Sequence, residues 1–352
     1  MKRFAKTISL ITAAVMLLGI AALPAAAAES GSCGDGLTWT FDNGVLTVGG
    51  EGAMTDYYAN SPDDMPPWVE LPVTSIVVEE GVTSLGVNAF AYFTAGSVES
   101  ISLPASLTEI GYGALGRHLE AVSLAEDNEI FKLEGDCLIK EGKQIVLGCD
   151  ASVIPSDGSV KSIGPGAFMG CEGLTEITLP DGVVTIADKA FANCKNLVSV
   201  TLPDSLKRIG REAFADCVNL KSVDLPDRLE AIMYYAFAGC NSLESVTVPA
   251  SVKADSAYPF GYSTRATLKV CAHSFAHRIA EYFGYNFELI GTIGDFDGDG
   301  TVTVSDALSA LRIAAKLAEA DEAALIEGDL DFDGRITVGD ALAILRIAAG
   351  LA

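Results

Sequence analysis

The chain has 352 residues, which is enough for two or three domains that each bury a core of their own. Its formal net charge is −24 and its isoelectric point is about 4.3. This balance excludes nucleic acids and anionic lipid surfaces as expected partners, and it suits an extracellular protein that binds calcium.

The N-terminus has the three parts of a secretory signal peptide. A basic region lies within residues 1–6, an apolar run covers residues 8–23, and alanines 25–28 form a cleavage site. We expect cleavage after Ala28, which makes residues 1–28 the signal peptide. The alternative is an uncleaved anchor helix, which the short apolar run disfavours. No later segment has about 18 consecutive apolar residues, so we expect a secreted protein without membrane insertion after cleavage.

A repeat of 23 residues dominates the middle of the chain. An Ala-Phe pair recurs at this spacing, and a cysteine and a leucine follow it in phase. The phenylalanines are Phe168, Phe191, Phe214 and Phe237, and the cysteines are Cys171, Cys194, Cys217 and Cys240. Each Leu-x-x-Val-x-Leu segment is expected to form one short strand, with its Val and second Leu inside. One unit cannot bury its apolar face alone, so the repeats predict a stacked solenoid.

The repeat array is predicted to span residues 74–265. Between about residues 126 and 152 the period breaks, and two apolar segments flank a Glu-Gly pair, which predicts an inserted β-hairpin. Residues 29–73 contain alternating apolar segments and resemble the β-rich cap that often precedes such repeat arrays. Residues 266–290, with a helix expected over residues 274–283, resemble the C-terminal cap of such an array.

The cysteines of the repeats share one packing position, which favours buried free thiols over disulfides between neighbouring turns. Cys271, His273 and His277 could hold a metal on the cap helix. The pair of histidines lacks the glutamate of H-E-x-x-H, however, so a polar helix face is the favoured interpretation.

The 23-residue unit resembles the bacterial BspA-like (Treponema pallidum type) leucine-rich repeats over about residues 74–265. This resemblance implies a secreted or surface protein, in which caps flank the array. The outward strand positions Thr178, Thr201, Asp224 and Thr247 form a polar ladder without aromatic rings. A protein ligand and a solvated face are equally favoured there, whereas a polysaccharide usually needs an aromatic surface.

Two Asp-rich loops near the C-terminus lie 34 residues apart, and an apolar helix-forming segment follows each of them. Carboxylates at positions 1, 3, 5 and 12 and a backbone carbonyl at position 7 are the ligands of a calcium loop, and a glycine at position 6 allows its sharp turn. We therefore predict two Ca²⁺ ions. The first site is Asp295, Asp297, Asp299, Thr301 and Asp306, and the second is Asp329, Asp331, Asp333, Arg335 and Asp340. Without metal the carboxylates repel one another, so we expect calcium to be coupled to folding.

Two further positions of each loop have expected roles. Position 8, which is Val302 or Ile336, should pack between the two loops. Position 9, which is Thr303 or Thr337, can contribute to the metal through a water molecule.

No helix precedes the first loop and position 12 is Asp instead of Glu, so these loops differ from ordinary EF-hands. Residues 291–352 instead resemble a type I dockerin, a domain of two loop-helix repeats that holds two calcium ions and binds a cohesin of a scaffoldin. The resemblance implies cohesin contacts at positions 10 and 11 and on the helix behind them. The corresponding residues are Val304, Ser305, Leu311, Arg312, Lys316, Val338, Gly339, Leu345 and Arg346. Because the two repeats are so similar, we expect a pseudo-twofold domain that can present either helix.

These features predict an α+β protein, in which a leucine-rich-repeat solenoid with a β-rich cap precedes a small all-α calcium-binding dockerin. No stretch of about 150 residues remains for a catalytic domain, so we expect no enzyme. The expected protein is a secreted, non-catalytic subunit that docks onto a cohesin of a cellulosome-like, polysaccharide-degrading complex and displays its repeats to a protein ligand. Alternatives are a surface adhesin tethered by its dockerin, and a polysaccharide-degrading hydrolase or protease with an unrecognised site.

Overall fold

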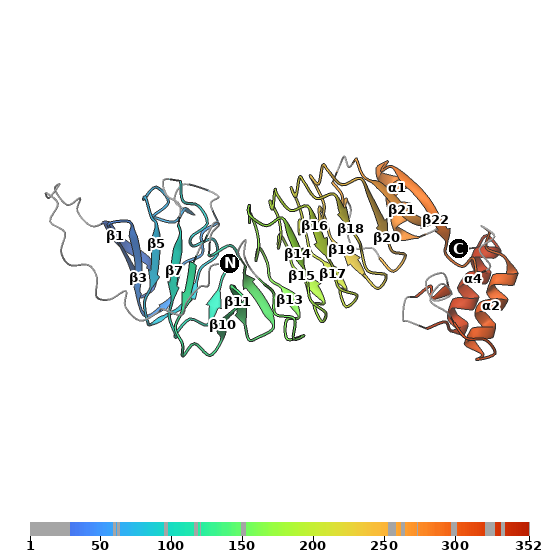
Figure 1. Ribbon diagram of the computed structural model, residues 1–352, viewed down its shortest axis with the longest axis horizontal. Coiled ribbons are helices and arrows are strands. Elements are labelled where there is room, and N and C mark those ends of the chain that lie inside the picture. Colours follow the sequence, from blue (N-terminus) through green and yellow to red (C-terminus); the bar gives the residue numbers. More distant parts are fainter. Residues whose placement is uncertain are drawn as a thin grey trace, which may run out of the picture.

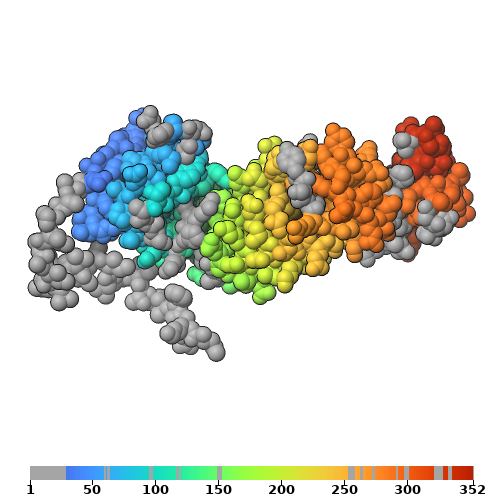
Figure 2. Space-filling view, turned by 90° about the horizontal axis from the view of Figure 1, so that it is seen from above, coloured from blue at the N-terminus to red at the C-terminus, as the bar shows by residue number. Residues whose placement is uncertain are grey.

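A computed structural model describes residues 29–58, 61, 64–94, 98–115, 119, 121–148, 153–252, 258–261, 265–272, 274–296, 301–320, 328–331 and 335–351. The predicted signal peptide, residues 1–28, lies outside the described residues. The described elements follow one another along one long axis, from strands near the N-terminus to two helices at the other end (Figure 1). The view from above shows the same extended outline (Figure 2).

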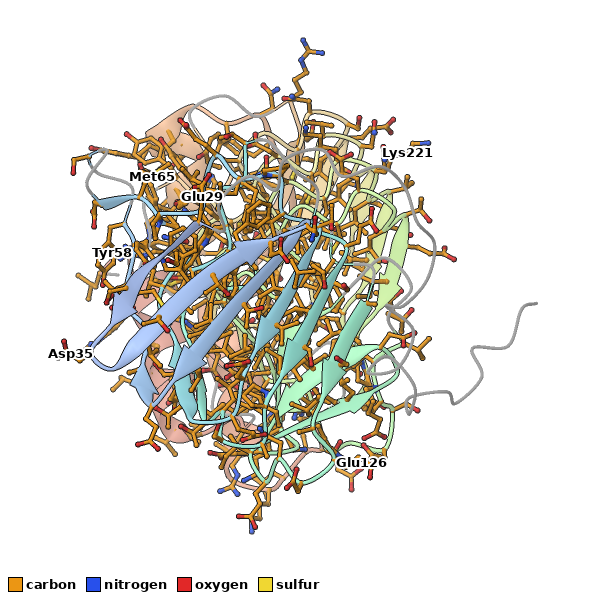
Figure 3. All side chains as sticks on the ribbon, turned by 90° about the vertical axis from the view of Figure 1, so that its left-hand side faces the viewer. Glu29, Asp35, Tyr58, Met65, Glu126 and Lys221 are labelled. Atoms are coloured by element: carbon orange, nitrogen blue, oxygen red, sulfur yellow. The ribbon has the colours of Figure 1, made fainter. Side chains whose placement is uncertain are left out.

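An antiparallel sheet covers the N-terminal end of the array. β1 (Glu29–Gly34), β2 (Leu37–Asp42) and β3 (Val45–Gly50) pair in succession, and β3 then pairs in parallel with β5 (Ser75–Val78). Because side chains alternate along a strand, the apolar residues of β2 and β3 share the inner face. The buried ones are Leu37, Trp39, Leu46 and Val48. Seen along the long axis, these strands lie in front of an interior filled with side chains (Figure 3).

Each repeat contributes two parallel strands, one more than the sequence predicts. In the first half of the array, β7 (Ser100–Leu103) and β9 (Ala121–Leu124) extend the sheet of β5. The second strands β4 (Gly52–Ala53), β6 (Val82–Leu85) and β8 (Glu109–Ile110) form a separate sheet. Most second strands have two residues, which is too short to show an alternating pattern in the sequence.

The second half of the array repeats with a constant register. Its first strands are β14 (Glu176–Thr178), β16 (Ser199–Thr201) and β18 (Ser222–Val223), and its second strands are β13 (Ser162–Ile163), β15 (Thr185–Ile186), β17 (Arg208–Ile209) and β19 (Ala231–Ile232). Paired residues such as Ile177 and Val200 differ by 23 positions, so like side chains stack on like. Within β16, Val200 is buried and Thr201 is exposed, which confirms the predicted alternation.

The interruption between the two halves is a three-stranded antiparallel element. β10 (Phe131–Glu134) pairs with β11 (Cys137–Lys140), and β11 pairs with β12 (Gln144–Leu147). The predicted hairpin of β11 and β12 is present, and β10 makes it wider than predicted. β12 then pairs in parallel with β13, so the hairpin is part of the sheet that continues through the second half.

A ladder of phenylalanine rings runs through the core of the second half. The centroids of Phe168, Phe191, Phe214 and Phe237 are 5.1, 5.1 and 5.3 Å apart in sequence order, with planes within 11° of parallel. Phe260 adds a fifth ring 5.6 Å beyond Phe237, although the sequence motif fades there. The ladder therefore extends one ring beyond the part of the sequence in which the repeat motif is complete.

The two halves of the array have separate apolar cores that meet at β11. Cys137 and Ile139 belong to the core of the second half, whereas Leu138, on the opposite face of the same strand, belongs to the first. Gly148 covers the first ring of the phenylalanine ladder, because a Cβ at this position would lie 2.0 Å from the ring of Phe168. No larger residue fits between the hairpin and the ladder without movement of the ring.

A parallel sheet of β20 (Ser245–Val248), β21 (Thr267–Ala272) and β22 (Phe287–Thr292) closes the array. α1 (Phe275–Phe283) connects β21 to β22, and its N-cap Ser274 matches the predicted helix start. β22 runs two residues past the predicted end of the C-terminal cap, because its last residues still pair with β21.

Beyond the cap, α2 (Val304–Ala314) and α4 (Val338–Ala348) follow the two Asp-rich loops and contact each other. We call residues 291–351 the C-terminal module. Within the part of the chain that the structure describes, no helix combines the length and the apolar character needed to cross a membrane.

Candidate functional site

All buried charged side chains of the described residues lie in the C-terminal module. Asp295, Asp306, Asp329 and Asp340 are between 1% and 5% exposed, and the other buried polar residues, Ser251 and Ser274, are uncharged. A buried carboxylate is costly unless a cation or several hydrogen bonds compensate it. The loops of the module are therefore the strongest candidates for a cation site.

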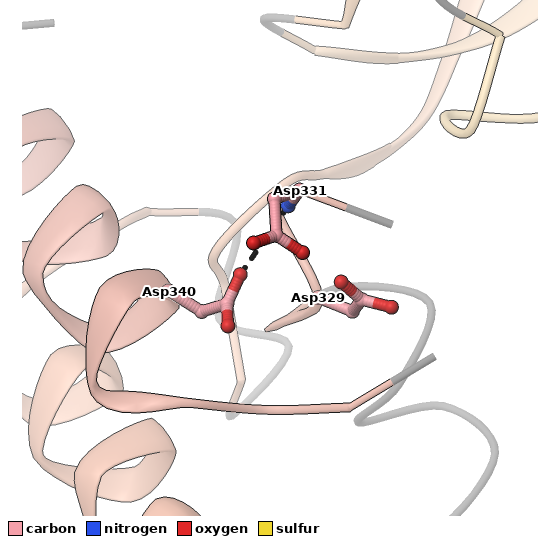
Figure 4. Close-up of side chains that lie close together, drawn as sticks. All are labelled: Asp329, Asp331 and Asp340. Atoms are coloured by element: carbon pink, nitrogen blue, oxygen red, sulfur yellow. Dashed lines mark hydrogen bonds between the residues drawn. The ribbon is translucent and has the colours of Figure 1, made fainter. Parts of the chain in front are cut away.

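The second loop brings three carboxylates together. Asp329, Asp331 and Asp340 each offer one oxygen, and these oxygens lie within 4.8 Å of one another (Figure 4). Calcium binds oxygen at about 2.3–2.6 Å, so two oxygens on one ion lie at most about 5 Å apart. The three side chains therefore fit a single cation of this size. Within the described ranges, they are the one cluster of three or more potential metal ligands at such spacing.

The remaining predicted ligands are only partly described. Asp295, Thr301 and Asp306 of the first loop and Arg335 of the second are described, and Thr301 and Arg335 are exposed. Asp297, Asp299 and Asp333 lie outside the described residues. If calcium binds as predicted, Thr301 and Arg335 would contribute backbone carbonyls, and the aspartates would contribute carboxylate oxygens.

The aspartate at position 12 joins each loop to the helix that follows it. Oδ1 of Asp340 accepts a hydrogen bond from the backbone N–H of Leu330 at 2.8 Å, and Oδ2 accepts one from the N–H of Thr337 at 2.8 Å. Asp306 accepts the equivalent two bonds in the first loop, at 2.8 and 2.7 Å. These bonds orient the carboxylate, and the positive end of the helix dipole stabilises its charge.

Thr303 and Thr337 are the N-caps of α2 and α4. Their hydroxyl groups accept the N–H of Ser305 or Gly339 at 3.1 Å and donate to the carboxylates at position 12, at 2.9 and 2.8 Å. This capping role was not among the roles predicted for the two threonines. The signal was present, because a Thr three residues before an acidic residue at the start of an apolar run marks a capping box.

A small apolar cluster supports the two loops. Val302 and Ile336 both contribute to it, which agrees with the packing expected at position 8. The fully buried members are Ala307, Ala310, Ile336, Ala341 and Ile344. Because three of these five residues are alanines, the cluster buries little apolar area, and its hydrophobic stabilisation is correspondingly small.

Both helices of the module expose an apolar stripe. Val304, Leu308 and Leu311 of α2 are 66%, 48% and 42% exposed. Their counterparts Val338, Leu342 and Leu345 on α4 are 62%, 53% and 39% exposed. The spacing i, i+4, i+7 places each trio on one helix face. The other predicted contact residues, Ser305, Arg312, Lys316, Gly339 and Arg346, are also exposed.

Leu308 and Leu342 lie at the centre of these stripes and were absent from the predicted contact set. Helical periodicity counted from Val304 and Val338 would have found them. An exposed apolar residue on its own is ordinary, but two matching stripes on neighbouring helices form a surface suited to a protein partner.

The predicted surface of the array faces solvent. Thr178, Thr201, Asp224 and Thr247 are all exposed, and Thr178 pairs directly with Thr201 in neighbouring strands. They form the flat polar ladder that the alternation predicts. Exposure alone assigns no ligand to it.

A groove of about 260 Å³ lies at the junction of the two halves, where β8 ends its sheet and the hairpin begins the next. Lys140 reaches Glu109 across it with an Nζ–Oε2 distance of 2.6 Å. The ring of Tyr112 lines it, and burial raises the pKa of this phenol. The groove combines one ion pair with apolar walls, and its described lining contains no histidine, cysteine or serine to act as a nucleophile or a base.

The repeat cysteines form a column of thiols in the core of the second half. The thiols of Cys194, Cys217 and Cys240 donate to the carbonyls of Phe168, Phe191 and Phe214, at 3.0, 3.2 and 3.2 Å. Cys194, Cys217 and Cys240 are free thiols, as their shared packing position predicted. Burial raises the pKa of Cys240 to about 12, so this thiol stays protonated and unreactive at neutral pH.

The predicted histidine site is only partly described. His273 lies outside the described residues. Nε2 of His277 lies 3.6 Å from Oε1 of Glu281, and its half-buried ring packs against Phe287 of β22.

Comparison with known proteins identifies the repeats. The profile of the BspA type leucine rich repeat region matches residues 69–139 and 147–271, in six copies. These segments make up more than half of the chain and exclude the C-terminal module. The comparison with curated proteins gives no match.

Several solved structures are similar to this chain. A leucine rich cell surface protein from Faecalibacterium prausnitzii A2-165 has a TM-score of 0.49 at 18% identity, over 71% of this chain and 96% of that one. A leucine-rich repeat protein from Eubacterium ventriosum ATCC 27560 has a TM-score of 0.34 at 21% identity, over 68% and 96%. The T. pallidum leucine rich repeat protein has a TM-score of 0.30 at 19% identity, over 75% and 97%.

Proposed function

Because this chain belongs to the BspA-type leucine-rich-repeat family, we propose that it is a secreted, non-catalytic binding subunit whose repeats recognise a protein and whose C-terminal module docks onto a second protein. In this proposal the module is a type I dockerin. It would bind two calcium ions, and its partner would be a cohesin of a scaffoldin in a polysaccharide-degrading complex. The protein would then be held at the cell surface through that cohesin.

The observation that carries the proposal is that the module consists of two similar halves. Each half has an Asp-rich loop, a Thr-Asp capping box and an exposed apolar stripe at equivalent positions. A structural calcium loop alone needs no exposed leucines behind it. The cluster of Asp329, Asp331 and Asp340 supports the metal, and the stripes support a partner that buries them.

The two stripes have matching composition, so a partner able to bind one of them would find the same side chains on the other. We therefore retain the expectation that the module binds in two alternative orientations. The stripe centred on Leu308 and the stripe centred on Leu342 would then substitute for each other.

The test uses residues 29–352 immobilised on beads, with extracts of the source organism, in calcium and in chelator. The expected result is capture of a cohesin-bearing protein in calcium only, identified by mass spectrometry. Replacing Val304 and Leu308 by alanine, or Val338 and Leu342 by alanine, should each preserve capture, whereas all four replacements should abolish it. Alanine favours helix, so these variants keep α2 and α4.

A matched control replaces the exposed array residues Thr201 and Thr247 by alanine, which should leave capture unchanged. Loss of capture in either two-residue variant would disprove binding in two orientations. If no cohesin-bearing protein is captured in calcium, the docking function is wrong.

A further inference from the structure

A cluster of aromatic side chains lies on the surface at the C-terminal end of the array, away from the polar ladder of the strands. Its rings form a continuous chain of contacts. Tyr234 stacks on Tyr235 at a centroid distance of 3.9 Å, and Tyr234 meets Tyr258 edge-on at 6.5 Å. Tyr258 contacts Phe283 at 3.9 Å, and Phe283 contacts Tyr282 at 4.8 Å. We call these five residues the tyrosine patch.

The tyrosine patch is accessible to a ligand. Tyr282 of α1 is 82% exposed, and the other four rings are half-buried. The next ring inward, Tyr285, is buried, and its hydroxyl donates to the carbonyl of Gly261 at 2.7 Å. The patch is therefore the solvent-facing end of an aromatic cluster that is anchored in the core.

Two of the tyrosines occupy an unfavourable backbone conformation. Tyr235 and Tyr258 have φ values of 60° and 63°, in the left-handed region that bulky residues rarely adopt. The equivalent position of an earlier repeat is Gly166, with a φ of 66°, which suits this conformation. The same conformation recurs at this position in the preceding repeats, so the turn of the repeat imposes it and fixes the backbone from which the two rings project.

The position repeats along the array and forms a column on the surface. Lys189 and Glu212 precede Tyr235 and Tyr258 at intervals of 23 residues, each with positive φ. The backbone N–H of Tyr235 donates to the carbonyl of Tyr258 at 3.0 Å, which keeps the two side chains on neighbouring turns. The column therefore changes from an ion pair, with 3.5 Å between Lys189 and Glu212, to aromatic rings.

We propose that the tyrosine patch is a binding site for a neutral polysaccharide. A tyrosine ring offers an apolar face and a hydroxyl without charge, which complements a sugar ring with a C–H face and hydroxyl groups at its edge. The net charge of −24, with the exposed Glu281 next to Tyr282 in α1, repels anionic polymers and favours a neutral chain. The expectation of a strand ladder without aromatic rings is unaffected, because the patch lies outside that ladder.

The proposal is independent of calcium and of the docking surface, since no residue of the C-terminal module takes part. Its test is native affinity electrophoresis of residues 29–352 in calcium, in gels that contain hydroxyethyl cellulose, xyloglucan, galactomannan or starch. A gel with polygalacturonate serves as the anionic comparison. We expect retardation in at least one of the neutral gels and none in polygalacturonate.

The decisive variant is Tyr235→Gly/Tyr258→Gly, because glycine fits the backbone at positive φ and only the rings are lost. We expect the apparent Kd for the retarding polysaccharide to rise at least tenfold. The matched control Lys189→Gly/Glu212→Gly makes the same backbone change at the same position of the preceding repeats. It should bind within twofold of the unaltered protein.

Tyr282→Ala provides a second measurement that does not depend on the strained positions, because Tyr282 is exposed on a helix where alanine is favoured. It should weaken binding severalfold, and circular dichroism should match the unaltered protein. Failure of all four neutral polysaccharides to retard the unaltered protein would overturn the proposal. Unchanged binding by both the double glycine variant and Tyr282→Ala would also overturn it.

Discussion

The repeat array and the C-terminal module stabilise their folds by different means. The array buries long rows of identical apolar residues, such as the ladder from Phe168 to Phe237. The module buries three alanines and three isoleucines, together with four aspartates. Hydrophobic burial is sufficient for the array, whereas the module holds buried negative charge that a cation would neutralise. The two parts should therefore respond independently to metal, to cavities and to pH.

The largest expected effect is that of calcium removal on the module. Ligand binding at 1,000 times its Kd stabilises a fold by about 4 kcal/mol, which is a large share of what so small a core provides. In chelator, we expect calorimetry to show the array transition unchanged and the module transition lost. Asp340→Asn should weaken the response to calcium. A module that melts at the same temperature with and without calcium would contradict the prediction.

A cavity in the array should destabilise the array and leave the module unchanged. Phe191 is fully buried between two rings at 5.1 Å, so Phe191→Ala should destabilise the array by about 3–5 kcal/mol. Urea denaturation measures this loss, and the calcium response of the module should not change. Phe260→Ala at the end of the ladder is the matched comparison and should cost less. Equal losses would show that the ladder does not act through its stacked neighbours.

An added methyl group at the junction of the halves should have a smaller effect. In Gly148→Ala the new Cβ would lie 2.0 Å from the ring of Phe168, so either the ring or the hairpin must move. Overpacking of this kind costs about 1–3 kcal/mol. The double variant with Phe168→Leu should recover part of the loss, and urea denaturation of all four proteins gives the coupling. If the losses of stability in the two single variants simply add in the double variant, the proposed contact is contradicted.

The effect that is smallest near neutral pH is the pH dependence of the buried thiols. Burial raises the pKa of Cys240 from 9.0 to about 12. The unfolded chain therefore loses this proton first, and the free energy of unfolding falls as the pH rises from about 9 to 12. The free energy of unfolding changes by at most about 1.4 kcal/mol per pH unit for each such thiol. Below pH 9 the thiol is protonated in both states, and its contribution to stability is then fully present. Cys240→Ala should make the decline in this window shallower, and an unchanged slope would contradict the assignment.

Much of the array could be predicted from the sequence, because a period of 23 residues repeats both the packing and the register. Val200, Phe214 and Cys217 are buried as expected, and Thr201 is exposed. The second strand of each repeat could not be predicted, since two residues are too few to show a pattern. The continuation of the ladder to Phe260 was missed for a related reason, because its flanking positions no longer match the motif.

The candidate site was predicted to a similar extent. The spacing of the aspartates placed Asp329, Asp331 and Asp340 in one set, and the structure brings their oxygens within 4.8 Å. The capping role of Thr303 and Thr337 and the central residues Leu308 and Leu342 were missed, although the capping box and the helical period both signal them. None of these four residues belongs to the predicted set of metal ligands.

Local spacing in the sequence predicts the turn of the solenoid, its inward and outward positions, and the order of carboxylates in the two loops. Which distant residues meet depends on the tertiary structure. It joined Tyr234, Tyr258 and Phe283 into one surface, it divided the array into two cores at β11, and it opened the groove between Glu109 and Lys140. The physical reason is that a repeat specifies its own shape, whereas contacts between unlike segments arise where the repetition stops.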